Sequence, residues 1–109
     1  MGITKTGLFS DRQNKLARMA KIMAHPARIA ILDYIIKAQR CICNDLVVEL
    51  GLAQPTVSQH LKELKSAGLI NGAIEGTSVC YSLNTENWKL YKETFLNFFV
   101  DAASLRQVC

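Results

Sequence analysis

Two short helical segments joined by a tight turn constrain this chain more than any other feature of its sequence. The Asn-Asp pair at 44–45 provides a strong helix start, and Gly51 provides the left-handed stop that ends many helices. After three further residues Pro55 opens a second helix, which Gly68 ends. Two short helices joined in this way form a helix-turn-helix, so the sequence predicts that motif.

Hydrophobic periodicity predicts the elements on either side of the motif. Outside the motif we expect a helix over 10–24, a helix over 26–37, a very short strand over 40–43, hairpin strands over 69–74 and 78–83, and a last helix from 84 or 85. Residues 1–9 are expected to form a mobile arm, followed by a single domain over 10–105. The predicted fold is therefore mainly α with a small β-hairpin: a winged helix-turn-helix with extra N- and C-terminal dimerisation helices.

Apolar spacing also predicts which helix faces are buried. In the second helix of the motif, Val57, Leu61 and Leu64 form one inward row. The helix over 26–37 has a wide apolar face made of Ile29, Ile31, Leu32, Ile35 and Ile36. A face of that width predicts packing on more than one side.

Charge is distributed unevenly along the 109 residues, of which 50% are hydrophobic. Residues 1–65 carry ten basic and five acidic side chains, whereas residues 66–109 carry three basic and four acidic ones. Any anion-binding face is therefore expected to lie in the first two thirds of the chain. The sequence offers no catalytic motif, no organic-cofactor motif and no apolar run long enough to span a membrane, which predicts a cytoplasmic protein that is not an enzyme.

Three segments resemble the ArsR family of bacterial metal-responsive repressors. They are MAHPARIAIL at 23–32, NDLVVELGLAQPTVSQHLKELKSAGLI at 44–70 and EGTSVCYSL at 75–83. The resemblance implies a winged-helix homodimer, joined through its terminal helices, that binds double-stranded operator DNA and is released by an inducer. Aromatic residues crowded on the last helix, among them Phe95, Phe98 and Phe99, independently favour such an interface.

The outward face of the second helix of the motif is the candidate DNA-binding surface. Polar side chains near its start suit base edges, and its lysines suit phosphate. The candidate residues are Gln54, Thr56, Ser58, Gln59, His60, Lys62 and Lys65. For His60 two roles stay open, a DNA contact or a hydrogen bond at the flank of the helix. The hairpin tip lacks the basic residues common in the family, so its contact with phosphate is in doubt.

Cysteines form the candidate inducer site. If 41–43 is the first strand of a winged helix and pairs with the second hairpin strand, Cys41, Cys43 and Cys80 emerge together on its outer face. Thiolate ligands select soft ions, so the expected inducer is As(III) or Sb(III), with another soft metal ion as an alternative. The family's arsenic-sensing cysteines lie one position closer to the Asp-Leu of the third helix, so the geometry must differ. Cys109 is either an accessory ligand or not involved.

Two other functions remain open at this point. The same thiols could serve a redox-sensing repressor on the same scaffold. A winged helix that binds a protein instead of DNA is the third reading, supported only by the uncharged wing.

Overall fold

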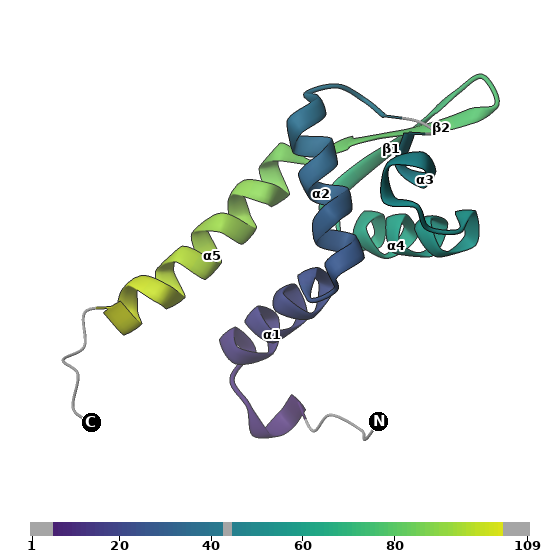
Figure 1. Cartoon of the computed structure of the whole chain (residues 1–109). Helices are drawn as coiled ribbons and strands as arrows, with labels where there is room; N and C mark the ends of the chain where they lie inside the picture. Colours follow the sequence, from purple (N-terminus) through teal and green to yellow (C-terminus); the bar gives the residue numbers. More distant parts are fainter. Residues whose placement is uncertain (1–5, 43–44, 104–109) are drawn as a thin grey trace.

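The computed structural model describes residues 6–42 and 45–103. After a short 3-10 helix at Thr6–Leu8, the chain forms α1 (Asp11–Met23), α2 (Pro26–Ala38), α3 (Asp45–Leu50), α4 (Gln54–Ser66), β1 (Ile70–Glu75), β2 (Ser78–Leu83) and α5 (Thr85–Ala103). Figure 1 shows α2, α3, α4 and the hairpin gathered into a compact unit, from which α1 and α5 extend toward the side of the two termini. The mainly α winged helix-turn-helix is confirmed.

Local signals in the sequence explain where the helices begin. Ser10 and Gln13 form a reciprocal capping box at the start of α1. Pro26 lies in the first turn of α2, where its missing N–H needs no helical partner, and the His25 side chain accepts a hydrogen bond from the Ala27 N–H. At α5, Asn84 accepts a hydrogen bond from the Asn87 N–H.

The end of α4 is fixed by a close approach between two elements. Gly68 adopts φ +79°, and a Cβ at this position would lie 2.6 Å from Nδ2 of Asn87. That same Nδ2 donates to the Gly68 carbonyl at 2.9 Å. Glycine at 68 therefore both ends α4 and allows the first turn of α5 to dock there.

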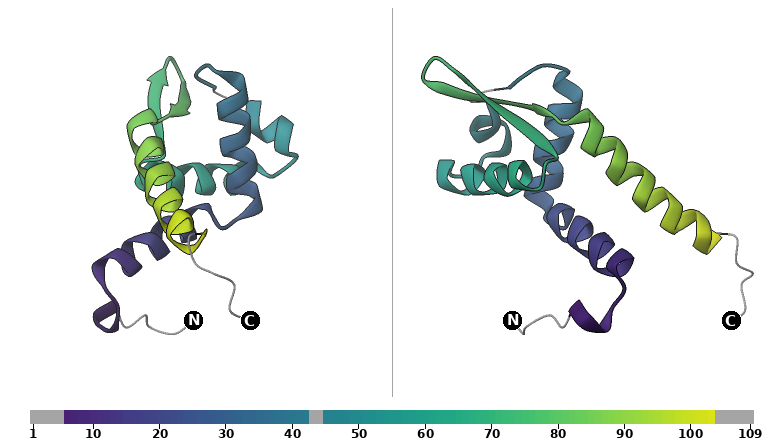
Figure 2. Two further views of the ribbon diagram at one scale, coloured as in Figure 1. Left: turned by 90° about the vertical axis from the view of Figure 1, so that its left-hand side faces the viewer. Right: turned by 180° about the vertical axis from the view of Figure 1, so that it is seen from behind.

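The sheet is small and acts mainly as the wing. β1 and β2 pair antiparallel, with Ile70 opposite Leu83 and Glu75 opposite Ser78. Ile42 exchanges two backbone hydrogen bonds with Tyr81, at 2.9 and 2.7 Å. The expected short strand before the third helix is thus an isolated bridge to the second hairpin strand. Figure 2 shows the long hairpin projecting beyond the helices.

A single apolar core holds the compact unit together. It is formed by α2, Ile42, α3, α4 and the residues entering β1. Its buried members are Ile31, Leu32, Ile35, Ile42, Leu46, Val57, Leu61, Leu64, Leu69 and Ile70. The inward row of α4 is confirmed, but the broad face of α2 is narrower than expected because Ile29 and Ile36 are exposed.

Candidate nucleic-acid interface

Helix α4 has a buried apolar row on one side and a polar face on the other, which points away from the core. Val57, Leu61 and Leu64 are at most 5% exposed, which fixes the rotation of the helix about its axis. Six of the seven predicted DNA-binding side chains lie on the exposed part of the helix. They are Gln54, Thr56, Ser58, Gln59, Lys62 and Lys65.

Hydrogen bonds along α4 order its exposed amides. Gln54 Nε2 donates to Ser58 Oγ at 3.0 Å, and Gln59 Nε2 donates to Glu63 Oε1 at 3.0 Å. Ala53, the residue that caps α4, has no side chain that could accept from the first N–H groups. The start of the helix therefore presents polar side chains and backbone donors together, a combination suited to an anionic partner.

Lys65 lies across the first strand of the wing. A Cβ on Gly72 would be 3.2 Å from its Nζ and 3.4 Å from its Cε, so the lysine occupies space that only glycine leaves. Its aliphatic stem is thereby packed on β1 while its ammonium stays at the surface.

His60 takes the second of the two roles that the sequence left open. It is 8% exposed, and Arg28 Nε donates to its Nδ1 at 3.2 Å. Its ring lies 4.3 Å from that of His25, measured between centroids. Burial, followed by the charges of His25 and Arg28, lowers its pKa against the opposing effect of Glu63. The flank hydrogen bond is thus the one that forms, and Arg28 of α2 and its N-cap His25 contact the His60 ring.

The wing carries no basic side chain along 70–83. Ile74 is 81% exposed near its tip, beside Glu75. A polar cleft of about 230 Å³ separates the wing from the start of α4, and Gln54, Ser58 and Thr77 are among the residues that line it. The wing can therefore offer hydroxyl and backbone groups to DNA, but no cationic side chain.

Asp45 anchors the start of α3, the helix that supports α4. It accepts from Arg40 Nη2 at 2.8 Å and from the Tyr34 hydroxyl at 3.1 Å. The hydrogen bond from Arg40, and then that from Tyr34, hold the pKa of Asp45 below its usual value. Arg40 and Asp45, which lie on either side of Cys41 in the sequence, are thus joined by an ion pair.

The two cysteines that the structure describes differ in bonding state and burial. Cys41 is a half-buried free thiol beside a cleft lined by Ile35, Ile36 and Leu83. Cys80 is disulfide-bonded and 1% exposed, and its Sγ lies 3.5 Å from Glu75 Oε2. The expectation that Cys80 emerges on an outer face is wrong for this oxidised state, in which its side chain is buried. Cys43 and Cys109 lie outside the described residues.

No group of three or more potential metal ligands occurs within 6–42 and 45–103. The proposed three-cysteine set includes Cys43, so the described residues alone cannot assemble it. None of the described helices is long and apolar enough to cross a bilayer.

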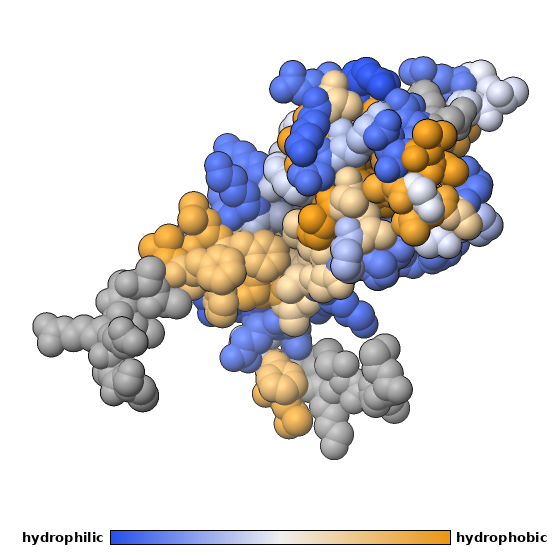
Figure 3. Space-filling model, viewed as in Figure 1, coloured by the Kyte–Doolittle hydropathy of each residue, from blue (hydrophilic) through white to orange (hydrophobic). Residues whose placement is uncertain are grey.

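Helices α1 and α5 expose a continuous apolar surface. It includes Phe95, Phe98 and Phe99 of α5 and Leu16 and Ala20 of α1, which together line an open hollow of about 410 Å³. Phe99 is 62% exposed, and Figure 3 shows hydrophobic side chains gathered over the far part of α5. An apolar surface of this kind marks an interaction site.

The sequence did not predict a basic cleft that is formed by α1, the start of α2, the end of α4 and α5. Lys15, Arg18 and Lys21 of α1 line it together with Arg28 of α2, and no local sequence pattern links these residues. The spacing of Lys15, Arg18 and Ile22 on one side of α1 is the signal that could have suggested it.

The chain is similar in sequence to known bacterial regulatory proteins. Residues 25–72 match the family model "Bacterial regulatory protein, arsR family". The chain is 33% identical over 72 residues to the arsenical resistance operon repressor of Staphylococcus xylosus, a match covering 66% of this chain and 68% of that protein. It is 45% identical over 65 residues to the repressor SmtB of Mycobacterium tuberculosis, covering 60% of this chain.

The match to SmtB spans 47% of that protein, so this chain spans about half its length. Among solved structures, a homodimeric winged helix-turn-helix DNA-binding domain from Mycobacterium bovis superposes with a TM-score of 0.61 at 26% identity. The superposition covers 100% of this chain and 96% of the other. These relatives are transcriptional regulators, not enzymes.

Proposed function

Since this chain belongs to the ArsR family of bacterial regulatory proteins, we propose that it is a cytoplasmic, homodimeric repressor that binds double-stranded operator DNA through α4. One observation carries the proposal: α4 buries Val57, Leu61 and Leu64 and turns an unbroken polar face outward. A helix supported in this way by a preceding short helix is suited to the major groove.

The exposed side chains of α4 divide by chemistry into two sets. Gln54, Thr56, Ser58 and Gln59, near the start of the helix, offer donors and acceptors to base edges. Lys62 and Lys65 follow them and suit phosphate oxygens. His60 is left out of both sets because it is buried under Arg28.

The apolar surface of α1 and α5 supports dimerisation. Phe98 and Phe99 are 42% and 62% exposed in one chain, and a second copy related by a two-fold axis would cover them. Two copies of α4 would then read half-sites about one helical turn apart, roughly 34 Å.

For the inducer we propose a thiophilic metalloid, As(III) or Sb(III), bound by Cys41, Cys43 and Cys80. The arsenical resistance operon repressor among the relatives supports this choice. Metal binding requires thiolates, so the disulfide at Cys80 must be reduced first. Three sulfurs drawn onto one ion would tie β2 to the segment before α3 and could alter the angle of α4 to DNA.

A redox switch is the second candidate, and the disulfide at Cys80 is the observation that favours it. Oxidation by a peroxide would convert two thiols into a disulfide, the peroxide being reduced to water. The bond would lie beside Tyr81, which is joined to Ile42 just before α3. The redox and metalloid proposals therefore act on the same part of the molecule.

A gel-shift on DNA selected from genomic fragments tests both proposals. The reduced protein should bind an imperfect inverted repeat, and arsenite should release it. Cys41→Ser, Cys43→Ser and Cys80→Ser should each bind DNA normally but lose the arsenite response, whereas Cys109→Ser serves as the control. If peroxide releases the wild type and arsenite does not, the redox switch replaces the metalloid site. DNA binding without sequence preference at every salt concentration would leave the protein-binding winged helix as the remaining function.

A further inference from the structure

A cleft on the opposite side of α1 from the apolar surface is the strongest feature that DNA binding and dimerisation do not use. It has a volume of about 540 Å³ and is formed by α1, the start of α2, the end of α4 and α5. A cavity of this size falls within the usual range for small-molecule sites. We propose that it binds a small organic anion with an apolar body, such as an aromatic carboxylate or sulfonate.

The charge around the cleft supports an anionic ligand. Lys15, Arg18 and Lys21 come from α1 and Arg28 from α2, while Glu63 is the one acidic residue that lines it. Arg28 is held in place by two bonds: it donates to the Ile22 carbonyl at 3.2 Å and to His60 Nδ1. The cleft therefore has an excess of positive charge with one cation already positioned.

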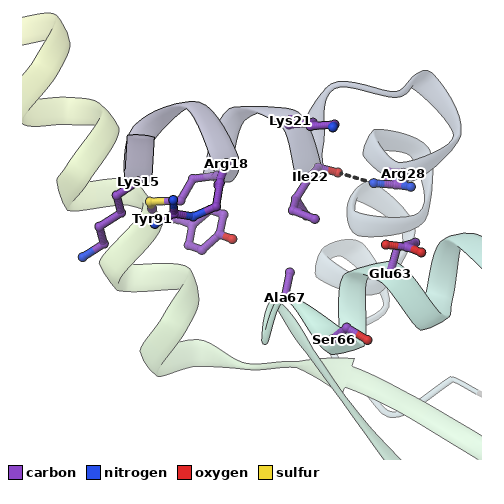
Figure 4. A pocket seen from close by; sticks show the side chains of 10 residues that line it. Lys15, Arg18, Lys21, Ile22, Arg28, Glu63, Ser66, Ala67 and Tyr91 are labelled. Carbon is purple, nitrogen blue, oxygen red and sulfur yellow. Dashed lines mark hydrogen bonds between the residues drawn. The ribbon is translucent and has the colours of Figure 1, made fainter. Parts of the chain in front are cut away.

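The interior of the cleft supports an apolar ligand body. Figure 4 shows Ile22 and Ala67 pointing toward each other across the gap, with Arg18 beside the ring of Tyr91. Tyr91 also borders a smaller apolar hollow of about 170 Å³, lined by Met23, Trp88 and Phe95 as well. A ligand with an aromatic or branched body could thus contact apolar carbon on several sides.

The Tyr91 side chain offers a polar contact at the wall of the cleft. Its hydroxyl makes no hydrogen bond with the residues that the structure describes, and burial raises its pKa. A protonated hydroxyl beside Arg18 can donate to an anionic oxygen.

The proposed dimer would leave this cleft open, because the two surfaces lie on different faces of α1. Gln13, Leu16, Ala17 and Ala20 border the apolar hollow, and Lys15, Arg18, Met19 and Ile22 border the basic cleft. Both sets repeat with the helical spacing i, i+3, i+4 and i+7, and they are offset by two residues. At about 100° per residue, two residues correspond to roughly 200° around the helix.

The cleft also lies away from the base-reading end of α4. Ser66, which lines it, is the last residue of that helix, and Gln54 is the first. At 1.5 Å per residue these ends are about 18 Å apart, which separates the cleft from the predicted base contacts. A bound anion would bridge α1 to the end of α4. Any effect of the anion on operator affinity rests on the proposed function, whereas binding of the anion to the cleft does not.

Energy transfer from Trp88 provides a direct test, since it is the only tryptophan of the chain. The probe is 8-anilino-1-naphthalenesulfonate, an aromatic sulfonate, titrated into the full chain without DNA. We expect saturable energy transfer with one site per chain. Arg18→Glu should raise the dissociation constant about five- to tenfold, because a partly exposed attraction becomes a repulsion. Ala67→Leu, which fills the cleft, should weaken binding similarly.

Lys37→Glu is the matched control, because it makes the same charge change at an exposed position outside the cleft. The uncharged probe N-phenyl-1-naphthylamine reports apolar surface alone and should bind the wild type and Arg18→Glu equally. Circular dichroism and thermal unfolding confirm that each variant folds. Equal sulfonate affinity of wild type and Arg18→Glu, or equal weakening by Lys37→Glu, would overturn the proposal.

Two further outcomes identify other occupants and would also overturn it. If the signal falls as sedimentation shows the dimer forming, a second copy of the chain covers the cleft. If Arg18→Glu weakens DNA binding in the absence of any organic anion, the cleft is a phosphate contact. Failure of the operator gel-shift together with retained sulfonate binding would reject the repressor proposal while leaving the anion site intact.

Discussion

The compact unit and the two terminal helices bury apolar side chains to very different extents. In the compact unit Ile31, Leu64 and Leu69 are completely buried, whereas on α5 Phe98 and Phe99 remain 42% and 62% exposed. The amino-acid types are equally hydrophobic, so the difference lies in the number of elements around them. The compact unit completes its own core, whereas α1 and α5 need another surface.

Replacing a core residue should have the largest effect on folding. Leu64→Ala removes a fully buried side chain from the last turn of α4 and should lower the free energy of unfolding by about 2 to 5 kcal/mol. Urea denaturation followed by circular dichroism measures this loss. Val48→Ala, at a position that is 83% exposed on α3, should stay close to wild type. Equal losses for the two variants would contradict the assignment of the core.

Replacing an exposed apolar residue of α5 should instead act on association. Phe98→Ala and Phe99→Ala each remove apolar area that a second copy would cover, so sedimentation should shift toward the monomer and operator binding should weaken with it. The unfolding free energy of the monomer should change much less than in Leu64→Ala. A wild-type chain that sediments as a monomer at tens of micromolar would contradict the dimer.

The exposed face of α4 belongs to the compact unit but should affect neither folding nor association. Gln59→Ala should relax the base preference, by about 1 to 3 kcal/mol of discrimination at one position. Lys62→Ala should weaken all DNA sequences similarly and reduce the salt slope by about one unit. Fluorescence anisotropy on operator and scrambled DNA at several salt concentrations separates the two effects. Identical behaviour of both variants would contradict the division of α4 into base-reading and phosphate-binding residues.

Local signals predicted the parts of the fold that depend on neighbours in sequence. The capping residue Ser10, the inward row of Val57, Leu61 and Leu64, and the strand Ser78–Leu83 follow from periods and caps that a short window contains. Each of these features is set within a few residues along the chain, and for this reason the winged helix-turn-helix was predictable.

Features set by distant contacts could not be predicted. His60 is buried because Arg28, 32 residues away, bonds to its ring. The state of Cys80 depends on oxidation, which strand alternation does not encode. Ile29 stays exposed because the apolar face of α2 is wider than the elements packed on it. The basic cleft likewise exists only once α1 and α4 are brought together.

One set of contacts joins the two regions. Arg28 Nη1 donates to the Ile22 carbonyl in the last turn of α1, and its Nε donates to His60 Nδ1 on α4. His25, the N-cap of α2, stacks at a tilt against the His60 ring. Within 6–42 and 45–103, these hydrogen bonds of Arg28 therefore link α1 to α4 through a titratable ring.

Protonation of His60 should weaken this junction, the smallest of the predicted effects. Its native pKa lies below the unfolded value near 6.5, chiefly because of burial, so its contribution is complete above about pH 6.5 and is lost as the pH falls through the native pKa. Urea denaturation should show a larger loss of unfolding free energy between about pH 7.5 and 5 in the wild type than in His60→Gln, whose amide oxygen can still accept from Arg28. His25→Asn retains a side chain that can cap α2 and serves as the control. If His25→Asn flattens the pH profile and His60→Gln does not, protonation of His60 is not the cause of the loss.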